Sequence, residues 1–220
     1  MELLDIYSDR NESLNKAVLR AEAHKNGLWH RKFVCILANE DRKSVLFQRQ
    51  HKKKSNNFSR PEYLNISVGG HLSSGENIED GIREFEEESG LSGVKFSDLK
   101  FLGIRQSSFS LKKNGKDFIN NEFQYIHIYK GNFDCNSFNI ESNEETKGFV
   151  DIKIDDGILL LTNQVESIKA LEYINGKSEV ITITKNDFIP DYLVKDDFIL
   201  RNFIAGQRYL ENPEDNLLFW

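Results

Sequence analysis

The sequence has few cysteines, no long apolar run and no surplus of positive charge. Only Cys35 and Cys135 occur among its 220 residues, and neither lies in a CxxC pair. A disulfide framework, a cysteine zinc site and a redox pair are therefore not expected. Each thiol is expected to lie in or beside the core, because free cysteine packs as a small hydrophobic residue. This cysteine usage fits a reducing, cytoplasmic compartment.

Membrane and nucleic-acid classes are also disfavoured. There is no run of about 18 apolar residues that could span a bilayer. Residues 1–13 include acidic side chains and no apolar signal-peptide core, which again favours a cytoplasmic protein. With 29 basic and 35 acidic residues, the formal net charge of −6 gives no general attraction for nucleic acid or an anionic membrane. Any phosphate must be bound locally, by a few basic groups or by metal ions.

Length and hydrophobic patterning predict one domain of class α/β. Residues 1–220 are expected to form a single domain, with an N-terminal extension (1–30), a core (31–150) and C-terminal strands and a helix (151–220). The patterns predict strands at 3–7, 33–38, 44–50, 64–68, 99–112, 122–131 and 178–184, and helices at 78–89 and 196–211. Residues 165–174 fit either state, and Asn114-Gly115 is typical of a hairpin turn. Strands on both sides of one helix predict a mixed sheet covered by helices.

The most informative segment is GGHLSSGENIEDGIREFEEESGL (69–91). Asn77 and Gly90 are suited to begin and end a helix here. A helix turns by about 100° per residue, so one face is apolar and the other gathers three carboxylates, namely Glu84, Glu87 and Glu88. Such neighbours repel by roughly 0.2–0.5 kcal/mol per pair, whereas a hard cation such as Mg²⁺ binds clustered oxygens. From the helix alone, a solvated acidic face is the alternative.

The same segment resembles a known family signature. Residues 83–91 are similar to the second half of the Nudix box, Gly-x5-Glu-x7-Arg-Glu-U-x-Glu-Glu-x-Gly-U, where U is a bulky apolar residue. Gly70-x5-Glu76 resembles the first half, but six residues instead of seven separate Glu76 from Arg83. The departure lies at the loop–helix junction and concerns Glu76 more than the helix glutamates.

The resemblance implies a fold and a set of roles. The fold is a Nudix-like α/β/α sandwich with a mixed sheet, extended here at both termini. Glu84, Glu87 and Glu88 would bind Mg²⁺, with Mn²⁺ as a substitute, and one of them would help to deprotonate the attacking water. Arg83 would orient a glutamate through a salt bridge. Gly70 would permit a turn and a close approach of the backbone.

Outside the box, three segments resemble the Nudix branch that includes type I isopentenyl diphosphate isomerase: 24–33, 69–72 and 120–129. That resemblance implies a metal site whose donors suit Mn²⁺, Zn²⁺ or Mg²⁺ and come from His24, His30, His71 and Glu122. Structural hydrogen bonding is the alternative for His24 and His30, and a phosphate contact is the alternative for His71. Glu122 is also a candidate metal ligand of the kind that hydrolases take from outside the box, with an exposed glutamate at a strand edge as the alternative.

Two departures disfavour isomerase chemistry. Gly69 stands where the isomerase has a cysteine that transfers a proton, and Asn120 replaces the first glutamate of its Glu-x-Glu pair. The box carboxylates are retained. Substrate contacts are expected from Arg49 to phosphate and from Tyr63 to a base, with core packing as the alternative for Tyr63. The basic loop 51–60 either steers phosphate or is a solvated loop.

The expected function is metal-dependent hydrolysis of a diphosphate linkage in a nucleoside diphosphate derivative or a similar small substrate. The alternatives are isopentenyl diphosphate isomerisation and a Nudix domain that senses a nucleotide without turnover. The expected partner is a small-molecule diphosphate substrate, without nucleic acid or membrane. The C-terminal tail 216–220 either packs on its own domain or contributes to a homodimer.

Overall fold

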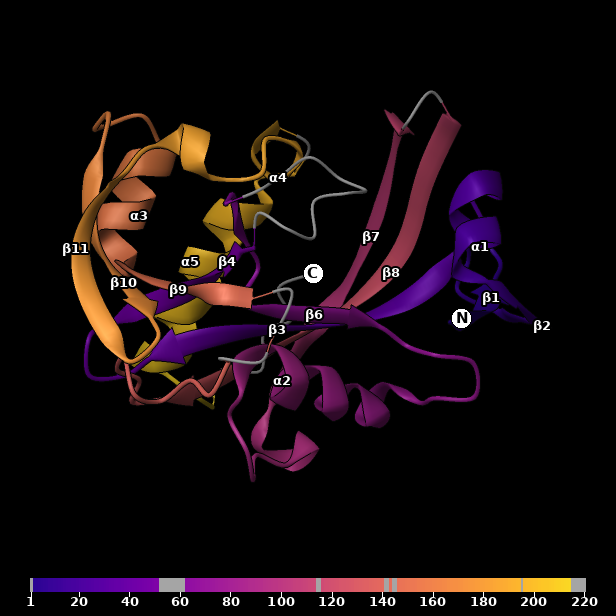
Figure 1. The fold of residues 1–220 in the computed structure, drawn as a ribbon, viewed down its shortest axis with the longest axis horizontal. Coiled ribbons are helices and arrows are strands. Elements are labelled where there is room, and N and C mark those ends of the chain that lie inside the picture. Colours follow the sequence, from indigo (N-terminus) through magenta and orange to yellow (C-terminus); the bar gives the residue numbers. More distant parts are fainter. Residues whose placement is uncertain are drawn as a thin grey trace.

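The computed structural model describes residues 2–51, 62–113, 116–140, 143, 146–194 and 196–214. Within them, a mixed sheet of nine strands forms the centre of the molecule (Figure 1). Seven strands follow the order β11-β10-β9-β4-β3-β8-β7, while β5 pairs with β4 and β6 pairs with β3. Their bounds are β3 (His30–Asn39), β4 (Ser44–Gln50), β5 (Leu64–Asn65), β6 (Val68–His71), β7 (Lys100–Lys113), β8 (Lys116–Gly131), β9 (Thr146–Lys153), β10 (Ile168–Ile174) and β11 (Lys177–Ile183).

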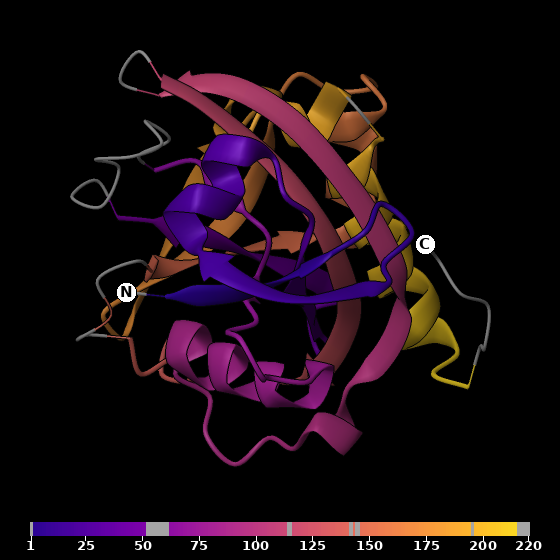
Figure 2. The same cartoon turned by 90° about the vertical axis from the view of Figure 1, so that its right-hand side faces the viewer.

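Helices cover the sheet on both faces, which confirms the predicted α/β/α sandwich (Figures 1 and 2). On one face α2 (Ile82–Ser89) buries Phe85 in a core cluster. On the other face α3 (Ile154–Leu161) and α5 (Phe198–Glu211) bury their apolar residues in a second cluster. The short helix α4 (Asp191–Val194) precedes α5.

Strand β3 shows how the sequence pattern builds these two layers. Val34, Ile36 and Ala38 point into the cluster beneath α3 and α5, whereas Phe33, Cys35 and Leu37 point into the cluster beneath α2. Successive side chains of a strand alternate between faces, so a continuous apolar run marks a strand that is buried on both sides. The strands predicted at 33–38 and 44–50 are thereby confirmed, and Cys35 is a core thiol as expected.

The N-terminal segment forms a separate two-stranded sheet and a short helix beside β8 (Figure 2). Strand β1 (Leu3–Tyr7) was predicted; β2 (Ser13–Leu19) and α1 (Arg20–Asn26) were not. The hairpin also reaches the loop before α2, because Asp5 accepts hydrogen bonds from Ser74 Oγ at 2.6 Å and from the Gly75 N–H at 2.9 Å. The extension therefore supports the segment that carries the box.

Several predicted boundaries differ from the structure. Residues 64–68 do not form one strand, because this segment changes its pairing partner: β5 pairs with β4, and β6 pairs with β3. Ser67 lies between them, and its hydroxyl accepts a hydrogen bond from the Leu37 N–H at 3.0 Å. The helix predicted at 78–89 begins as a 3₁₀ turn (Ile78–Gly81) and becomes α-helical only in α2. Residues 165–174 contain a strand, β10, and both β9 and α3 were missed.

The other long elements agree with expectation. Strands β7 and β8 pair antiparallel, β11 matches the strand predicted at 178–184, and α5 matches the C-terminal helix. The Asn114-Gly115 turn, most of the basic loop and the tail 216–220 lie outside the described residues. No helix in the described part of the chain is long and apolar enough to cross a membrane.

Candidate active site

Helix α2 presents the three box glutamates. The 3₁₀ turn before it is capped at Asn77, whose backbone N–H donates to the Asp80 carboxylate at 2.7 Å, and α2 ends at Gly90, whose φ of +70° closes the helix. Phe85 and Ser89 are buried, whereas Glu84 and Glu88 are half-buried and Glu87 is exposed. The predicted separation of apolar and acidic faces is confirmed.

Glu84 lies directly against the glycine strand β6. A methyl group at Gly70 would lie only 1.9 Å from Glu84 Cδ, so the absence of a side chain at Gly70 makes room for this carboxylate. Burial raises the pKa of Glu84, and the charge of Arg83 opposes that effect. Gly70 therefore leaves room for the Glu84 side chain, and its part in binding the substrate stays a prediction.

Glu88 is fixed by neutral donors from the sheet. Its Oε2 accepts the backbone N–H of Gly69 at 2.7 Å and Gln48 Nε2 at 3.3 Å. Gln48 also donates to Thr146 Oγ1 at 2.9 Å, which holds the amide in place from β9. Carboxylates held by N–H donors remain acceptors and can share their oxygens with a cation.

Arg83 joins three carboxylates. Its guanidinium lies 3.2 Å from Glu76, 2.9 Å from Glu84 and 3.1 Å from Glu87. Burial acts to lower the pKa of Arg83, but these carboxylates raise it above its ordinary value. Glu76 also accepts the Ser73 N–H at 2.7 Å, so the short spacing before Arg83 does not prevent Glu76 from reaching it.

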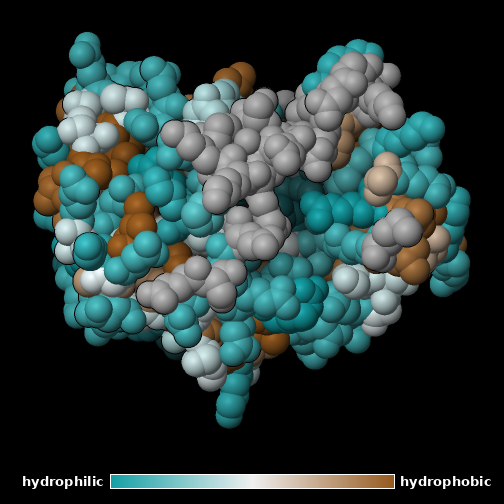
Figure 3. All heavy atoms as spheres, in the orientation of Figure 1, coloured by the Kyte–Doolittle hydropathy of each residue, from teal (hydrophilic) through white to brown (hydrophobic). Residues whose placement is uncertain are grey.

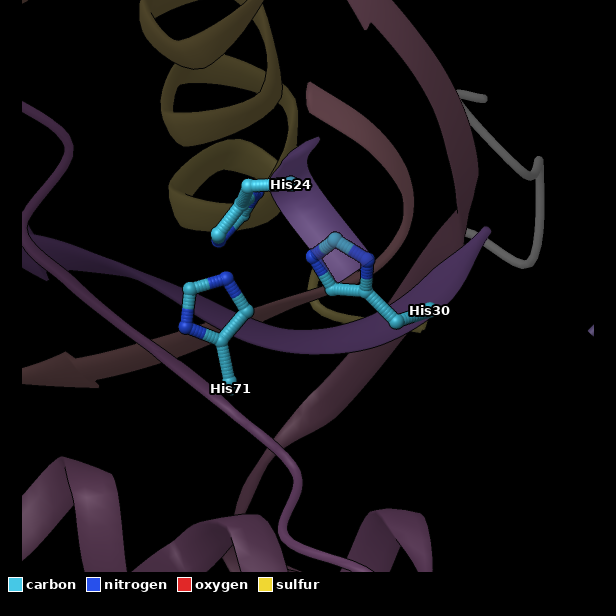
Figure 4. A group of neighbouring side chains, drawn as sticks. All are labelled: His24, His30 and His71. Atoms are coloured by element: carbon cyan, nitrogen blue, oxygen red, sulfur yellow. The ribbon is translucent and has the colours of Figure 1, made fainter. Parts of the chain in front are cut away.

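Three histidines from separate elements form a second cluster (Figure 4). His24 comes from α1, His30 from β3 and His71 from β6, and one ligand atom of each lies within 4.8 Å of the others. All three are buried. Glu122 of β8 stands opposite His30 in the parallel register, and its Oε1 lies 3.2 Å from His71 Nε2 and 3.9 Å from His30 Nε2.

Hydrogen bonds determine how His30 faces this cluster. His30 Nδ1 lies 2.9 Å from the Leu28 carbonyl, which can only accept, so Nδ1 carries the hydrogen. Its Nε2 then bears a lone pair. Among the described residues, neither His30 Nε2 nor His24 Nδ1 has a hydrogen-bond partner. Buried nitrogens without a partner are uncommon, and a bound cation would accept their lone pairs.

Protonation states in the cluster suit metal binding. Burial lowers the pKa of His24 to about 3 and also lowers the pKa of His30 and of His71. Burial alone would raise the pKa of Glu122, but the charge of Lys32 and the contact with His71 lower it well below its ordinary range. Neutral imidazoles beside an ionised carboxylate are the forms that bind divalent cations, so this donor set fits a metal ion.

Strand β6 connects the two clusters. Gly69 and Gly70 contact Glu88 and Glu84, and the next residue, His71, belongs to the histidine cluster. Lys32 lies beside the same strand, since a Cβ at Gly69 would be 3.2 Å from Lys32 Cε. Burial acts to lower the pKa of Lys32, but Glu122, Tyr192 and Glu88 raise it. A hydrophilic hollow lies above β6 on the face shown in Figure 3.

The expected substrate contacts remain predictions. Arg49 pairs with Glu172 and donates to the Glu62 carbonyl at 2.7 Å, while Tyr63 is half-buried just before β5. Sequence reasoning overlooked several polar residues at the site: Lys32, Gln48, Gln124 and Thr146. The strand period offered a clue to two of them, because Lys32 follows His30 by two residues and Gln124 follows Glu122 by two.

Comparison with known proteins identifies the family. The NUDIX domain model matches residues 28–154. An uncharacterized Nudix hydrolase of Clostridium acetobutylicum, CA_C0446, is 34% identical over 196 residues, which cover 86% of this chain and 90% of that protein. Nudix hydrolase 3 of Arabidopsis thaliana is 29% identical over 128 residues, covering 58% of this chain and 16% of that protein.

Among solved structures, DR0079 from Deinococcus radiodurans is 24% identical, with a TM-score of 0.49, and the match covers 74% of this chain and 88% of that one. The family match and the Clostridium relative extend over most of the fold and include the whole box. The chain belongs to the Nudix family and is a Nudix hydrolase.

Proposed function

We propose that the protein hydrolyses a diphosphate linkage in a nucleoside diphosphate derivative, with Mg²⁺ bound by Glu84, Glu87 and Glu88 and Mn²⁺ as a substitute. The observation that carries this proposal is the contact of two box carboxylates with the glycines of β6: Glu88 with Gly69, and Glu84 with Gly70. Glycines there let carboxylate oxygens and the strand backbone approach the same point. A diphosphate can approach such a point only when cations offset the negative charge.

The chain's own residues have separate tasks in this reaction. Water attacks phosphorus, the bond from phosphorus to the bridging oxygen breaks, and the leaving phosphate departs with that oxygen. The bound cation would supply charge neutralisation and lower the pKa of water. One of the three glutamates accepts the proton of the attacking water, and we propose Glu84 for this role because burial raises its pKa. Arg83 holds Glu84 and Glu87 in position, and the Gly69 N–H with Gln48 holds Glu88.

We further propose that the histidine cluster with Glu122 holds a second divalent ion. Three imidazoles and one carboxylate favour a transition-metal ion such as Zn²⁺ over Mg²⁺, and Mn²⁺ lies between the two in its ligand preference. Substrate then binds near β6, where Lys32, Arg49 and Tyr63 are the candidates to contact it, and a phosphate contact is the alternative role for His71. The geometry of the histidines favours isomerisation as the second candidate, but Gly69 has no side chain that can transfer a proton.

The two cysteines bear on the compartment in which we propose that the reaction takes place. Cys35 is buried and Cys135 is half-buried, and both are free thiols, which supports a reducing cytoplasmic setting. The partner we propose is a small diphosphate, without nucleic acid or membrane. A homodimer through the C-terminal tail remains a prediction.

A product assay tests the function. The protein is incubated with Mg²⁺ or Mn²⁺ and a panel of nucleoside di- and triphosphates, dinucleotides, nucleotide sugars and isopentenyl diphosphate. Release of phosphate or of a nucleoside monophosphate supports hydrolysis. Conversion of isopentenyl to dimethylallyl diphosphate overturns it in favour of isomerisation, and saturable nucleotide binding without product overturns it in favour of a sensing domain.

A further inference from the structure

A series of polar contacts, buried except at Asp196, links Glu122 to the C-terminal segment. Asp196 lies just before α5 and accepts two hydrogen bonds from Arg105, at 2.6 Å from Nε and 3.0 Å from Nη2. Arg105 Nη1 donates to Gln124 Oε1 at 2.8 Å. Gln124 Nε2 donates to Glu122 Oε2 at 2.6 Å. Four side chains from β7, β8 and the segment before α5 are thus connected in series.

The chemistry of the donors permits one arrangement of this chain. A guanidinium only donates and a carboxylate only accepts, so the Gln124 amide must turn its oxygen to Arg105 and its nitrogen to Glu122. Arg105, Gln124 and Glu122 are each at most 5% exposed, which leaves little room for water to replace a partner. Arg105 is further held over the Phe198 ring, at 4.1 Å from its centroid. The Gln124 amide is therefore fixed from both ends.

The two carboxylate oxygens of Glu122 consequently have different neighbours. Gln124 occupies Oε2, and Oε1 is the oxygen that lies near His71 and His30. A carboxylate that is free to rotate would exchange these oxygens. The contact with Gln124 keeps one of them directed into the histidine cluster.

We propose that Gln124, Arg105 and Asp196 are positioning residues that aim Glu122 Oε1 at a divalent transition-metal ion held by His24, His30 and His71. This inference rests on the second metal site of the proposed function. Partners behind a metal ligand orient it, and their loss typically lowers metal affinity by about 10–100-fold. The C-terminal segment thereby contributes to the affinity of a site to which it supplies no ligand.

The test measures Co²⁺ binding to the full chain by its visible absorption, which reports the ligand geometry as well as the affinity. Asp196→Asn removes the negative charge at the outer end of the chain, at a site that is partly exposed. Asp197→Asn is the matched control, since Asp197 is exposed and its φ of +52° suits asparagine. Asp196→Glu keeps the negative charge, and Gln124→Leu removes the amide that links Arg105 to Glu122.

We expect Asp196→Asn to weaken Co²⁺ binding about 10-fold and Gln124→Leu about 10–100-fold, with altered absorption bands in both. Asp197→Asn is expected to bind as the wild type does, and Asp196→Glu to regain most of the affinity. Thermal melts without metal identify any variant that has lost its fold, and Asp196→Asn then decides the outcome because it changes the surface end only.

Two results would overturn the inference in different ways. If the wild type gives a Co²⁺ spectrum that His71→Ala abolishes, while Asp196→Asn and Gln124→Leu bind normally, the positioning role is wrong and the metal site stands. If the wild type gives no Co²⁺ spectrum that depends on His71, the second metal site fails and the positioning role fails with it. Hydrolysis at the box glutamates is measured separately with Mg²⁺.

Discussion

Gly70 on β6 and Glu84 on α2 are in such close contact that a methyl group on Gly70 would lie 1.9 Å from Glu84 Cδ. We therefore expect Gly70→Ala to displace the Glu84 carboxylate and lower Mg²⁺-dependent turnover at least ~10-fold. Overpacking of this kind costs about 1–3 kcal/mol of unfolding free energy. Turnover assays and urea unfolding measure the two effects.

A double-mutant cycle identifies the cause. In a Glu84→Ala background the clash is removed, so Gly70→Ala should cost much less stability than it does in the wild type. Equal losses in the two backgrounds would show that Gly70 is needed for another reason.

Glu87 and Glu86 are neighbours on α2, are both exposed and differ in their contacts. Glu87 pairs with Arg83 at 3.1 Å, whereas Glu86 occupies the unspecified position of the box, about 100° around the helix from Glu87. We expect Glu87→Gln to lower turnover at least ~100-fold, because a charge that stabilises the transition state is lost. Glu86→Gln is the control and should retain nearly full turnover. Near-normal turnover of Glu87→Gln would remove Glu87 from the site.

Removal of divalent ions should affect activity and stability together. Treatment with EDTA is expected to abolish turnover, and added Mg²⁺ or Mn²⁺ to restore it. Because a ligand stabilises the state that binds it, Mg²⁺ at 100 times its Kd should raise the unfolding free energy by about 2.7 kcal/mol. A Glu84→Gln, Glu88→Gln double variant provides the comparison. If its melting temperature rose with Mg²⁺ as much as that of the wild type, the ions would bind elsewhere.

The buried side chain of His127 predicts how the stability of the fold depends on pH. Its Nδ1 lies 3.0 Å from the Tyr125 carbonyl, and its ring packs against Phe33, Phe96 and Phe101. Burial lowers the pKa of His127 from 6.5 to about 4. The unfolded chain is therefore protonated first, so the contribution of His127 is complete above pH 6.5 and is lost as the pH falls towards 4.

The unfolding free energy that His127 contributes, and that is lost at low pH, is on the order of 3 kcal/mol. Proton NMR of the His127 ring in the folded protein should give a titration midpoint near the lowered pKa. Urea unfolding at pH 7 and at pH 4 should show a smaller difference for His127→Gln than for the wild type. A midpoint at the ordinary value for histidine would contradict the buried, neutral ring.

The sequence allowed good prediction where periodicity and chemistry coincide. On α2, Phe85 had to face the core and Glu84, Glu87 and Glu88 had to face away, because both sets follow the helical period. The buried run of β3 was equally clear. Strand β2 was missed because six of its seven residues are exposed, so it shows no alternation. Helix α1 has only seven residues, too few for a helical pattern to stand out.

Contacts between distant strands were harder to foresee. Glu122 meets His30 through the parallel register of β3 and β8, which local sequence does not encode. The family resemblance grouped Glu122 with the histidines, but the Arg105 and Gln124 contacts depend on the pairing of β7 with β8 and on the segment before α5. Such partners are polar residues in ordinary strand positions, and only the assembled sheet distinguishes them.

The hydrogen bonds from Ser74 and Gly75 to Asp5 bear on how this protein can be recombined with its relatives. The family match begins at residue 28, so Asp5 and His24 both lie outside it, as does Asp196 at the other end. A chimera that exchanges only the matched core would transfer the glutamate helix. It would not transfer Asp5, which binds the loop before that helix, or His24, which supplies one imidazole of the histidine cluster. Grafts between homologues should therefore take their crossover points from the spatial neighbours of the box and not from the edges of the shared motif.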